Sequence, residues 1–91
     1  MAEQLFKLGK TVCTNRIAET IGIRGAIDYI NRHVAGDFGD LCDEDKDMNN
    51  SAIKNNNDRI LSAYTLPNDE KIYVITEWDR SVTTVLYADE Y

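Results

Sequence analysis

"RILSAYTLPNDEKIYVITEWDRSVTTVLY", residues 59–87, is the stretch of sequence that decides the fold. It holds three runs rich in β-branched and aromatic residues, at 59–66, 71–78 and 81–87, and such residues favour strands. The segments between the runs, "PNDE" and "DR", consist of turn-forming residues. The sequence therefore predicts three strands joined by two short turns, which is an antiparallel meander.

Alternation along the middle run divides its residues between the two faces of the sheet: Ile72, Val74 and Thr76 on one, Tyr73, Ile75 and Glu77 on the other. The apolar face has to be covered, and the segments before residue 59 are the natural cover. We therefore predict a single α+β domain over residues 1–91. Two or three N-terminal helices pack on a C-terminal three-stranded antiparallel sheet.

The first half of the chain carries helix signals. Thr14 and Asn15 offer N-cap oxygens ahead of "RIAETIGI" at 16–23. Gly22 and Gly25 are expected to bend or break that path. Helical spacing then resumes with a face formed by Ile27, Ile30 and Val34, and Gly36 is a C-cap candidate just past it.

Two further segments complete the expected layout. Residues 3–12 alternate loosely and predict a short edge strand or an extended arm, broken near Gly9. A third helix is expected through "CDEDKDMNNSAIKNN", residues 42–56, with Asp40 or Asp43 as its cap. The asparagines at 55–57 should end it, because asparagine tolerates left-handed backbone conformations.

Composition narrows the function classes. The 91 residues include 16 acids and 10 bases, for a formal charge of −6. This charge argues against direct nucleic-acid binding, since affinity for the phosphate backbone requires cations. An acidic surface suits a basic groove on another protein instead. Two cysteines do not indicate a disulfide scaffold, and no apolar run approaches a membrane span, so we expect a cytoplasmic protein with reduced thiols.

The segment "HVAGDFGDLCDED", residues 33–45, contains the chain's one histidine and admits two interpretations. His33, Asp37, Asp40 and Cys42 are all competent zinc ligands, and the glycines would let a short segment fold around an ion. The segment lacks the paired ligands of an established zinc motif. In the alternative interpretation, His33 interacts with the end of a helix and the acids cap or solvate the chain.

A second constellation lies in "ITEWDRS", residues 75–81. Together with His33, Glu77 and Arg80 would provide acid–base and phosphate-binding groups for a small ribonuclease of the RelE or barnase kind. The alternative is a hairpin turn with an ordinary cross-strand pair.

The third constellation is the acidic run of the expected third helix. From Asp40 to Asp58 the chain has six acids and two lysines, so most of the net charge lies there. Such a run is often only a solvated face, but it also suits a partner with a basic channel. Six acids make up the candidate partner-binding set: Asp43, Glu44, Asp45, Asp47, Glu77 and Asp79.

Nearly the whole chain resembles small proteins of plasmids, prophages and integrative elements that are often labelled type I restriction system subunits. The resemblance rests on "FKLGKTV", "RHVAGDFGDLCDEDK", "RILSAYTL" and "ITEWDRSVTTVLYADEY". The chain has Phe38 where the family commonly has tryptophan. In size, charge and organisation it is also similar to type II anti-CRISPR proteins, which inhibit the nuclease Cas9.

The resemblance implies that the protein interacts with defence systems of the host. The expected function is a non-enzymatic inhibitor that binds a host nuclease of the Cas9 kind through an acidic surface. The likeness to metal-holding inhibitors further implies a structural zinc on His33 and Cys42, with one or two of Asp37 and Asp40. The ribonuclease is the alternative, and a structural partner subunit is a third possibility.

Overall fold

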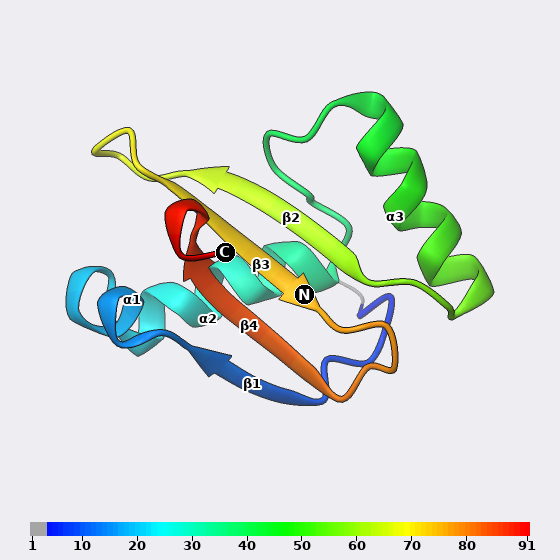
Figure 1. The fold of residues 1–91 in the computed structure, drawn as a ribbon, viewed down its shortest axis with the longest axis horizontal. Coiled ribbons are helices and arrows are strands. Elements are labelled where there is room, and N and C mark those ends of the chain that lie inside the picture. The colour runs from blue at the N-terminus through cyan, green and yellow to red at the C-terminus, as the bar shows by residue number, and fades with distance from the viewer. Residues whose placement is uncertain (1–3) are drawn as a thin grey trace.

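The computed structural model describes residues 4–91. In chain order the elements are β1 (Lys10–Cys13), α1 (Asn15–Thr20), α2 (Gly22–Val34), α3 (Asp43–Asn55), β2 (Ile60–Thr65), β3 (Lys71–Thr76), β4 (Val82–Tyr87) and the short 3-10 helix η1 (Ala88–Glu90). The predicted α+β class is confirmed. Figure 1 shows the sheet with α1 and α2 behind it and α3 beside β2.

The sheet differs from the predicted three-stranded antiparallel meander, because it has four strands in the order β1-β4-β3-β2. The antiparallel pairs β2–β3 and β3–β4 are present, and β1 adds a parallel pair with β4. The expected N-terminal edge strand therefore exists, but it spans Lys10–Cys13, after Gly9, and residues 4–9 of the expected segment form no strand; residue 3 lies outside the described residues. The parallel partner of β1 was not predictable from local pattern, because this pairing joins opposite ends of the chain, with Lys10 beside Val82.

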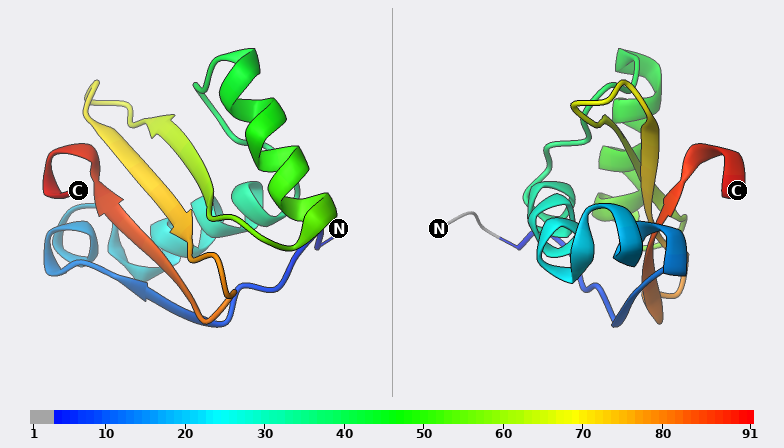
Figure 2. Two further views of the ribbon diagram at one scale, coloured as in Figure 1. Left: turned by 45° about the vertical axis from the view of Figure 1, so that its right-hand side comes forward. Right: turned by 90° about the vertical axis from the view of Figure 1, so that its left-hand side faces the viewer.

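One face of the sheet forms the main core. Ile72, Val74 and Thr76 of β3 are fully buried there, as their alternation predicted. Helices α1 and α2 cover this face, with Ile17 and Ile30 packed into it (Figure 2). Among residues 4–91, no α-helix lies across the opposite face. The short η1 contacts β3 there, and the ring of Tyr91 packs edge-on against Tyr73 at a centroid distance of 5.9 Å.

The N-terminal end of α1 and the C-terminal ends of α2 and α3 lie where their sequence signals predict. The Thr14 hydroxyl accepts a hydrogen bond from the Ile17 N–H as the N-cap of α1. Gly36 follows α2 with φ of +93°, and the Asp37 N–H reaches back to the Arg32 carbonyl. Asn56 ends α3 in the left-handed conformation.

Two local predictions about the helices are wrong. The N-cap of α3 is Cys42, so neither Asp40 nor Asp43 caps it, and the Cys42 side chain makes no capping bond. Ile27 was expected on the core face of α2, yet 49% of it is exposed. Gly22, with φ of +75°, is the first residue of α2 and marks the expected break from α1, whereas Gly25 lies within α2 and does not interrupt it. The buried residues of α2 are Ala26, Ile30, His33 and Val34.

The outer edge of β2 is covered by its own chain. The Ala63 N–H donates to the Phe38 carbonyl, and the Asp40 N–H donates to the Ala63 carbonyl, at 3.1 and 2.7 Å. Gly39 comes so close to Ala63 that a Cβ on Gly39 would lie 1.9 Å from the Ala63 oxygen. Within the described residues, no helix is both long and apolar enough to cross a membrane.

Candidate functional site

His33 lies on the inner face of α2 and is fully buried. Its Nδ1 lies 2.6 Å from the Ser62 hydroxyl of β2, and its Nε2 lies 2.9 Å from the Thr76 hydroxyl of β3. The Phe6 ring packs edge-on against the imidazole at 5.1 Å. Both ring nitrogens are therefore engaged with hydroxyl groups inside the core.

The hydrogen-bond chain beyond His33 fixes its tautomer. The Thr83 hydroxyl donates to the Leu8 carbonyl at 2.7 Å, so it must accept from the Thr76 hydroxyl, 2.7 Å away. Each hydroxyl has one proton, and Thr76 has now used its own. The His33 Nε2 therefore carries the hydrogen and donates to Thr76, while Nδ1 accepts from Ser62. Burial lowers the pKa of His33 to about 3, in agreement with a neutral ring.

The other three predicted zinc ligands are engaged elsewhere. Asp37 forms an ion pair with Arg32 at 2.8 Å, and this guanidinium lowers the pKa of the carboxyl. Asp40 accepts a hydrogen bond from the Thr65 hydroxyl at 2.6 Å, and Cys42 is exposed at the start of α3. Among residues 4–91, no three His, Cys, Asp or Glu side chains gather as a metal site.

In this arrangement the four side chains do not fit a zinc ion, because His33 has no free ring nitrogen and the other three point to separate partners. Zinc stays a prediction, and elemental analysis of the purified chain tests it.

His33, Glu77 and Arg80, the residues predicted for a ribonuclease, are also poorly placed to contact a substrate. Arg80 is only 8% exposed, and its guanidinium donates to the carbonyls of Ala52, Asp58, Glu77 and Trp78. His33 lies in the core and Glu77 is half-buried. Neither His33 nor Arg80 can touch an RNA in this conformation, since each is enclosed and already bonded within the protein.

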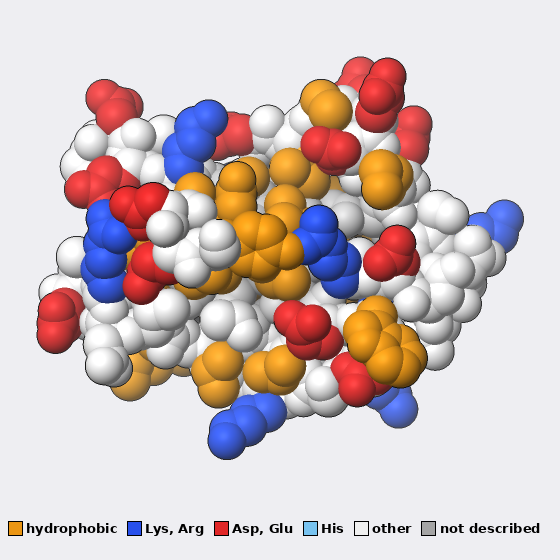
Figure 3. All heavy atoms as spheres, viewed as in Figure 1, with side chains coloured by type: hydrophobic (Ala, Val, Ile, Leu, Met, Phe, Trp, Pro, Cys, Tyr) orange, Lys and Arg blue, Asp and Glu red, His pale blue; other side chains and the backbone are white. Residues whose placement is uncertain are grey.

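The six predicted partner-binding acids fall into two groups. Asp43, Glu44 and Asp45 occupy the first turn of α3, and Asp47 follows. All four are exposed. Figure 3 shows acidic side chains gathered where α3 begins. Glu77 and Asp79 lie in the β3–β4 turn, which Arg80 links to the opposite end of α3 through the Ala52 carbonyl. The predicted surface is thus divided along the length of α3.

Asn49 holds α3 against the sheet. Its side-chain amide donates to the Leu61 carbonyl at 2.7 Å and accepts from the Leu61 N–H at 3.2 Å. These two bonds are the ones that a neighbouring strand would make with Leu61. Asn49 is 5% exposed, whereas the neighbouring Met48 is 64% exposed. The buried residues of α3 are therefore Asn49, which makes a polar contact with β2, and Ala52.

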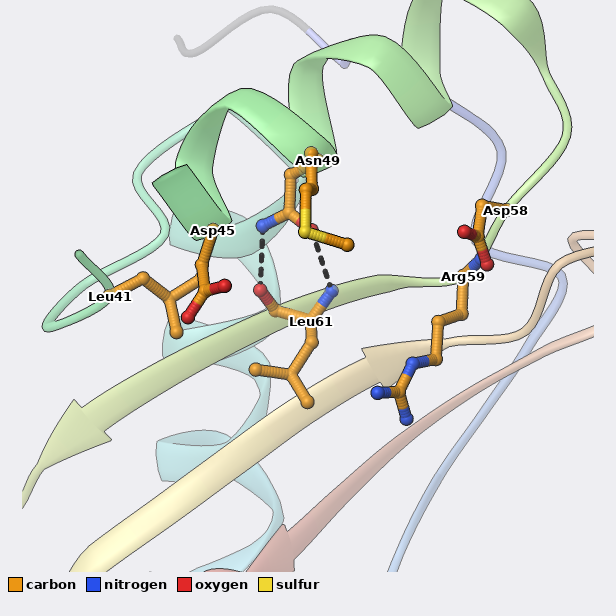
Figure 4. A pocket seen from close by; sticks show the side chains of 7 residues that line it. Leu41, Asp45, Asn49, Asp58, Arg59 and Leu61 are labelled. Carbon is orange, nitrogen blue, oxygen red and sulfur yellow. Dashed lines mark hydrogen bonds between the residues drawn. The ribbon is translucent and has the colours of Figure 1, made fainter. Parts of the chain in front are cut away.

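A hollow of about 200 Å³ opens beside this contact, between α3 and β2. Its walls are Leu41, Asp45, Met48, Asn49, Asp58, Arg59 and Leu61. Figure 4 shows Leu41 and Asp45 at one end, Asp58 and Arg59 at the other, and Asn49 with Leu61 between them. An apolar floor with a carboxylate at each end suits the stem and cationic head of a lysine or arginine side chain.

Arg59 does not neutralise this hollow from within. Its guanidinium donates to the hydroxyl of Tyr91 and faces the Tyr91 ring at 5.6 Å. The Arg59 charge is therefore directed toward the C-terminus and not toward the carboxylates.

Sequence reasoning found the acids of α3 but missed the residues that turn them into a site. The sequence places Asp58 at the end of the acidic run and Arg59 and Leu61 in a predicted strand, without indicating that they share a hollow with Asp45. The available signal was Asn49, a polar residue three positions before Ala52 on the buried side of a helix. No family model, curated protein or solved structure matches this chain.

Proposed function

We propose that this protein is a non-enzymatic inhibitor, carried by a mobile genetic element, that binds a host defence nuclease of the Cas9 kind. The contact surface is the exposed side of α3 with the adjoining hollow. The inhibitor acts by occupying a basic nucleic-acid channel of the nuclease or by blocking a domain movement.

One observation carries the proposal: the acids of α3 are free. Within residues 4–91, the ion pairs join Arg16 to Glu70 and Asp89, and Arg32 to Asp37. None of them involves Asp43, Glu44, Asp45 or Asp47. Carboxylates without internal partners keep their charge available for a basic surface and attract it over a distance.

The test compares two variants of equal charge. The first is the α3 variant, Glu44→Gln, Asp45→Asn and Asp47→Asn. The matched control is Glu19→Gln, Asp28→Asn and Asp69→Asn, three exposed acids outside α3. Binding to guide-loaded Cas9 and inhibition of target-DNA cleavage are measured for both variants and for the wild type.

We expect the wild type and the control to bind and inhibit, and the α3 variant to bind about tenfold more weakly or worse. Equal affinity of the two variants would remove α3 from the mechanism. Failure of the wild type to bind Cas9 would reject this target.

A further inference from the structure

Strand β1 is an edge strand with free backbone groups on its outer side. The N–H groups of Lys10 and Thr14 donate inward, to the carbonyls of Ser81 and Val85. Because backbone groups alternate in direction along a strand, those of Thr11 and Cys13 point away from β4. Among the described residues, no strand or loop lies beyond β1 (Figures 1 and 2).

An apolar groove of about 360 Å³ runs along this edge, between β1 and α2. Its walls are Thr11, Val12 and Cys13 on one side and Ile23, Ala26, Ile27 and Ile30 on the other. Ile23 is 67% exposed and Ile27 is 49% exposed. A free strand edge beside exposed isoleucines invites association with another chain.

We propose that a second copy of this chain occupies this edge. The two β1 strands pair antiparallel about a two-fold axis, so that two four-stranded sheets join into one sheet. Helices α2 of both copies lie on the same face, and their Ile23 and Ile27 side chains cover the new strand pair. This proposal is independent of the target proposed for α3.

The free groups of β1 match a second β1 in one register. Thr11 of each copy faces Cys13 of the other, so the outward groups of both residues are used at once. Val12 then faces its own counterpart as a pair without mutual hydrogen bonds, and the Cα atoms of such a pair lie about 4.5 Å apart. Pairing Thr11 with itself, or Cys13 with itself, would use fewer of the free groups.

The charge distribution permits two copies to meet here despite the net charge of −6. Residues 10–34, which form β1, α1 and α2, contain four bases and two acids. The acids of α3 lie beyond the opposite edge of the sheet, next to β2 (Figure 1). Arg16 and Arg32 form ion pairs with acids outside this range, so Lys10 and Arg24 balance Glu19 and Asp28. The surfaces that would meet are therefore close to neutral, and the strongly acidic α3 stays apart.

The experiment measures mass by sedimentation equilibrium over a range of concentrations. Three variants are compared with the wild type: Thr11→Pro, the pair Ile23→Lys and Ile27→Lys, and Met48→Lys as the control. Proline at residue 11 removes only an outward N–H, which edge strands tolerate. Met48 is as exposed as Ile23 but lies on α3. Circular dichroism checks that each variant is folded.

We expect the wild type and the Met48 variant to reach twice the mass of one chain. The dimer dissociation constants of the Thr11 and isoleucine variants should be about tenfold higher than that of the wild type, or more. A wild type that stays monomeric at every concentration overturns the proposal and leaves the edge to an extended segment of another protein. A dimer that survives both edge variants overturns it as well.

Cross-linking provides a gain of signal that does not depend on disrupting the fold. Val12→Cys, in a chain with Cys13→Ala and Cys42→Ser, should oxidise to a disulfide-linked dimer, because the distance across the axis suits a disulfide. Lys10→Cys in the same background is the control and should link far more slowly. Equal rates of linkage would contradict the register.

Discussion

At the scale of single residues, His33 shows how one buried side chain can organise three elements. It connects α2 to β2 and β3, and the hydroxyl chain continues to β4 and the Leu8 carbonyl. Every polar atom of this chain has a partner, which is the condition under which a buried polar network stabilises a fold. The same arrangement makes His33 the residue most sensitive to acid.

The first prediction concerns that sensitivity. The pKa of His33 is about 3 in the folded protein and near 6.5 unfolded. Between these values the unfolded chain binds a proton that the folded chain does not. The free energy of unfolding should therefore fall as the pH drops below about 6.5, with a slope approaching roughly 1.4 kcal/mol per pH unit.

Urea unfolding at pH 7, 6 and 5 measures this effect. His33 is the one histidine in the chain, and the lowered pKa values of Asp37 and Asp79 keep their contributions to lower pH. His33→Gln, which can still accept from Ser62 and donate to Thr76, is the control variant. Its stability should be lower at pH 7 but nearly flat over this range, and an unchanged slope would contradict the assignment.

Arg80 carries the second prediction. Its guanidinium donates to carbonyls of three segments, at the end of α3 (Ala52), between α3 and β2 (Asp58) and in the β3–β4 turn (Glu77 and Trp78). Lysine offers a single compact ammonium and leaves some of these carbonyls without donors. Arg80→Lys should therefore lower the free energy of unfolding by about 2 kcal/mol. Arg24→Lys, at an exposed position of α2, is the control and should change it by less than about 0.5 kcal/mol.

At the scale of elements, the strand meander and the helix caps were predictable because their signals are local. Thr14, Gly36 and Asn56 each do what their residue type favours. The place of β1 was not predictable, since nothing in "KTVC" says which strand it will join. The position of β1 beside β4 depends on Gly9, because its backbone passes close to Arg80 and Ser81 in the β3–β4 turn.

The third prediction tests that passage. Gly9 has φ of +65°, and a Cβ there would lie 2.3 Å from the Ser81 oxygen. Gly22 also has positive φ, at +75°, but a Cβ there meets nothing within 4 Å. Gly9→Ala should therefore cost clearly more stability than Gly22→Ala, which bears only the conformational cost of about 1 kcal/mol. Thermal unfolding of the two variants measures the difference, and equal losses would contradict the close approach.

The fourth prediction separates the two interpretations of the segment around Cys42. Cys42 has the extended backbone of an N-cap but no capping bond. Serine at this position can bond to the first turn of α3, so Cys42→Ser should stabilise the protein by about 0.5–1 kcal/mol. If Cys42 instead binds zinc, the same change should lower the melting temperature and the zinc content. Cys13→Ser serves as the control for removal of a thiol.

At the scale of the whole molecule, the sequence predicted an acidic surface and the structure divided it. The acids at 43–47 and those at 77 and 79 lie at opposite ends of α3, because Arg80 holds the β3–β4 turn against the end of that helix. Composition revealed the charge, but only the three-dimensional path of the chain places Asp58 and Leu61 on the same hollow as Asp45. Pairings between distant segments carry no local signal, and this is why the hollow was missed.

The fifth prediction follows from the charge of the whole surface. Binding through free carboxylates is screened by salt, whose Debye length at 0.1 M is about 10 Å. The association rate with a basic nuclease should therefore fall by about tenfold between 0.05 and 0.3 M sodium chloride. The α3 variant should show a shallower dependence than the Glu19, Asp28 and Asp69 control. Stopped-flow or surface-based kinetics measures both slopes, and parallel slopes would exclude α3 as the source of the attraction.

The covered margin of β2 has a consequence for how far the sheet can extend. Asn49 uses both backbone groups of Leu61, while Phe38 and Asp40 use those of Ala63. A newcomer strand finds no free donors or acceptors at these two residues. Lengthening is thus blocked at the middle of β2, which leaves the β1 side as the freer edge. A symmetric pair joined there, as proposed, would have a β2 edge of this kind at each end, and these edges would resist further edge-to-edge growth into a fibre.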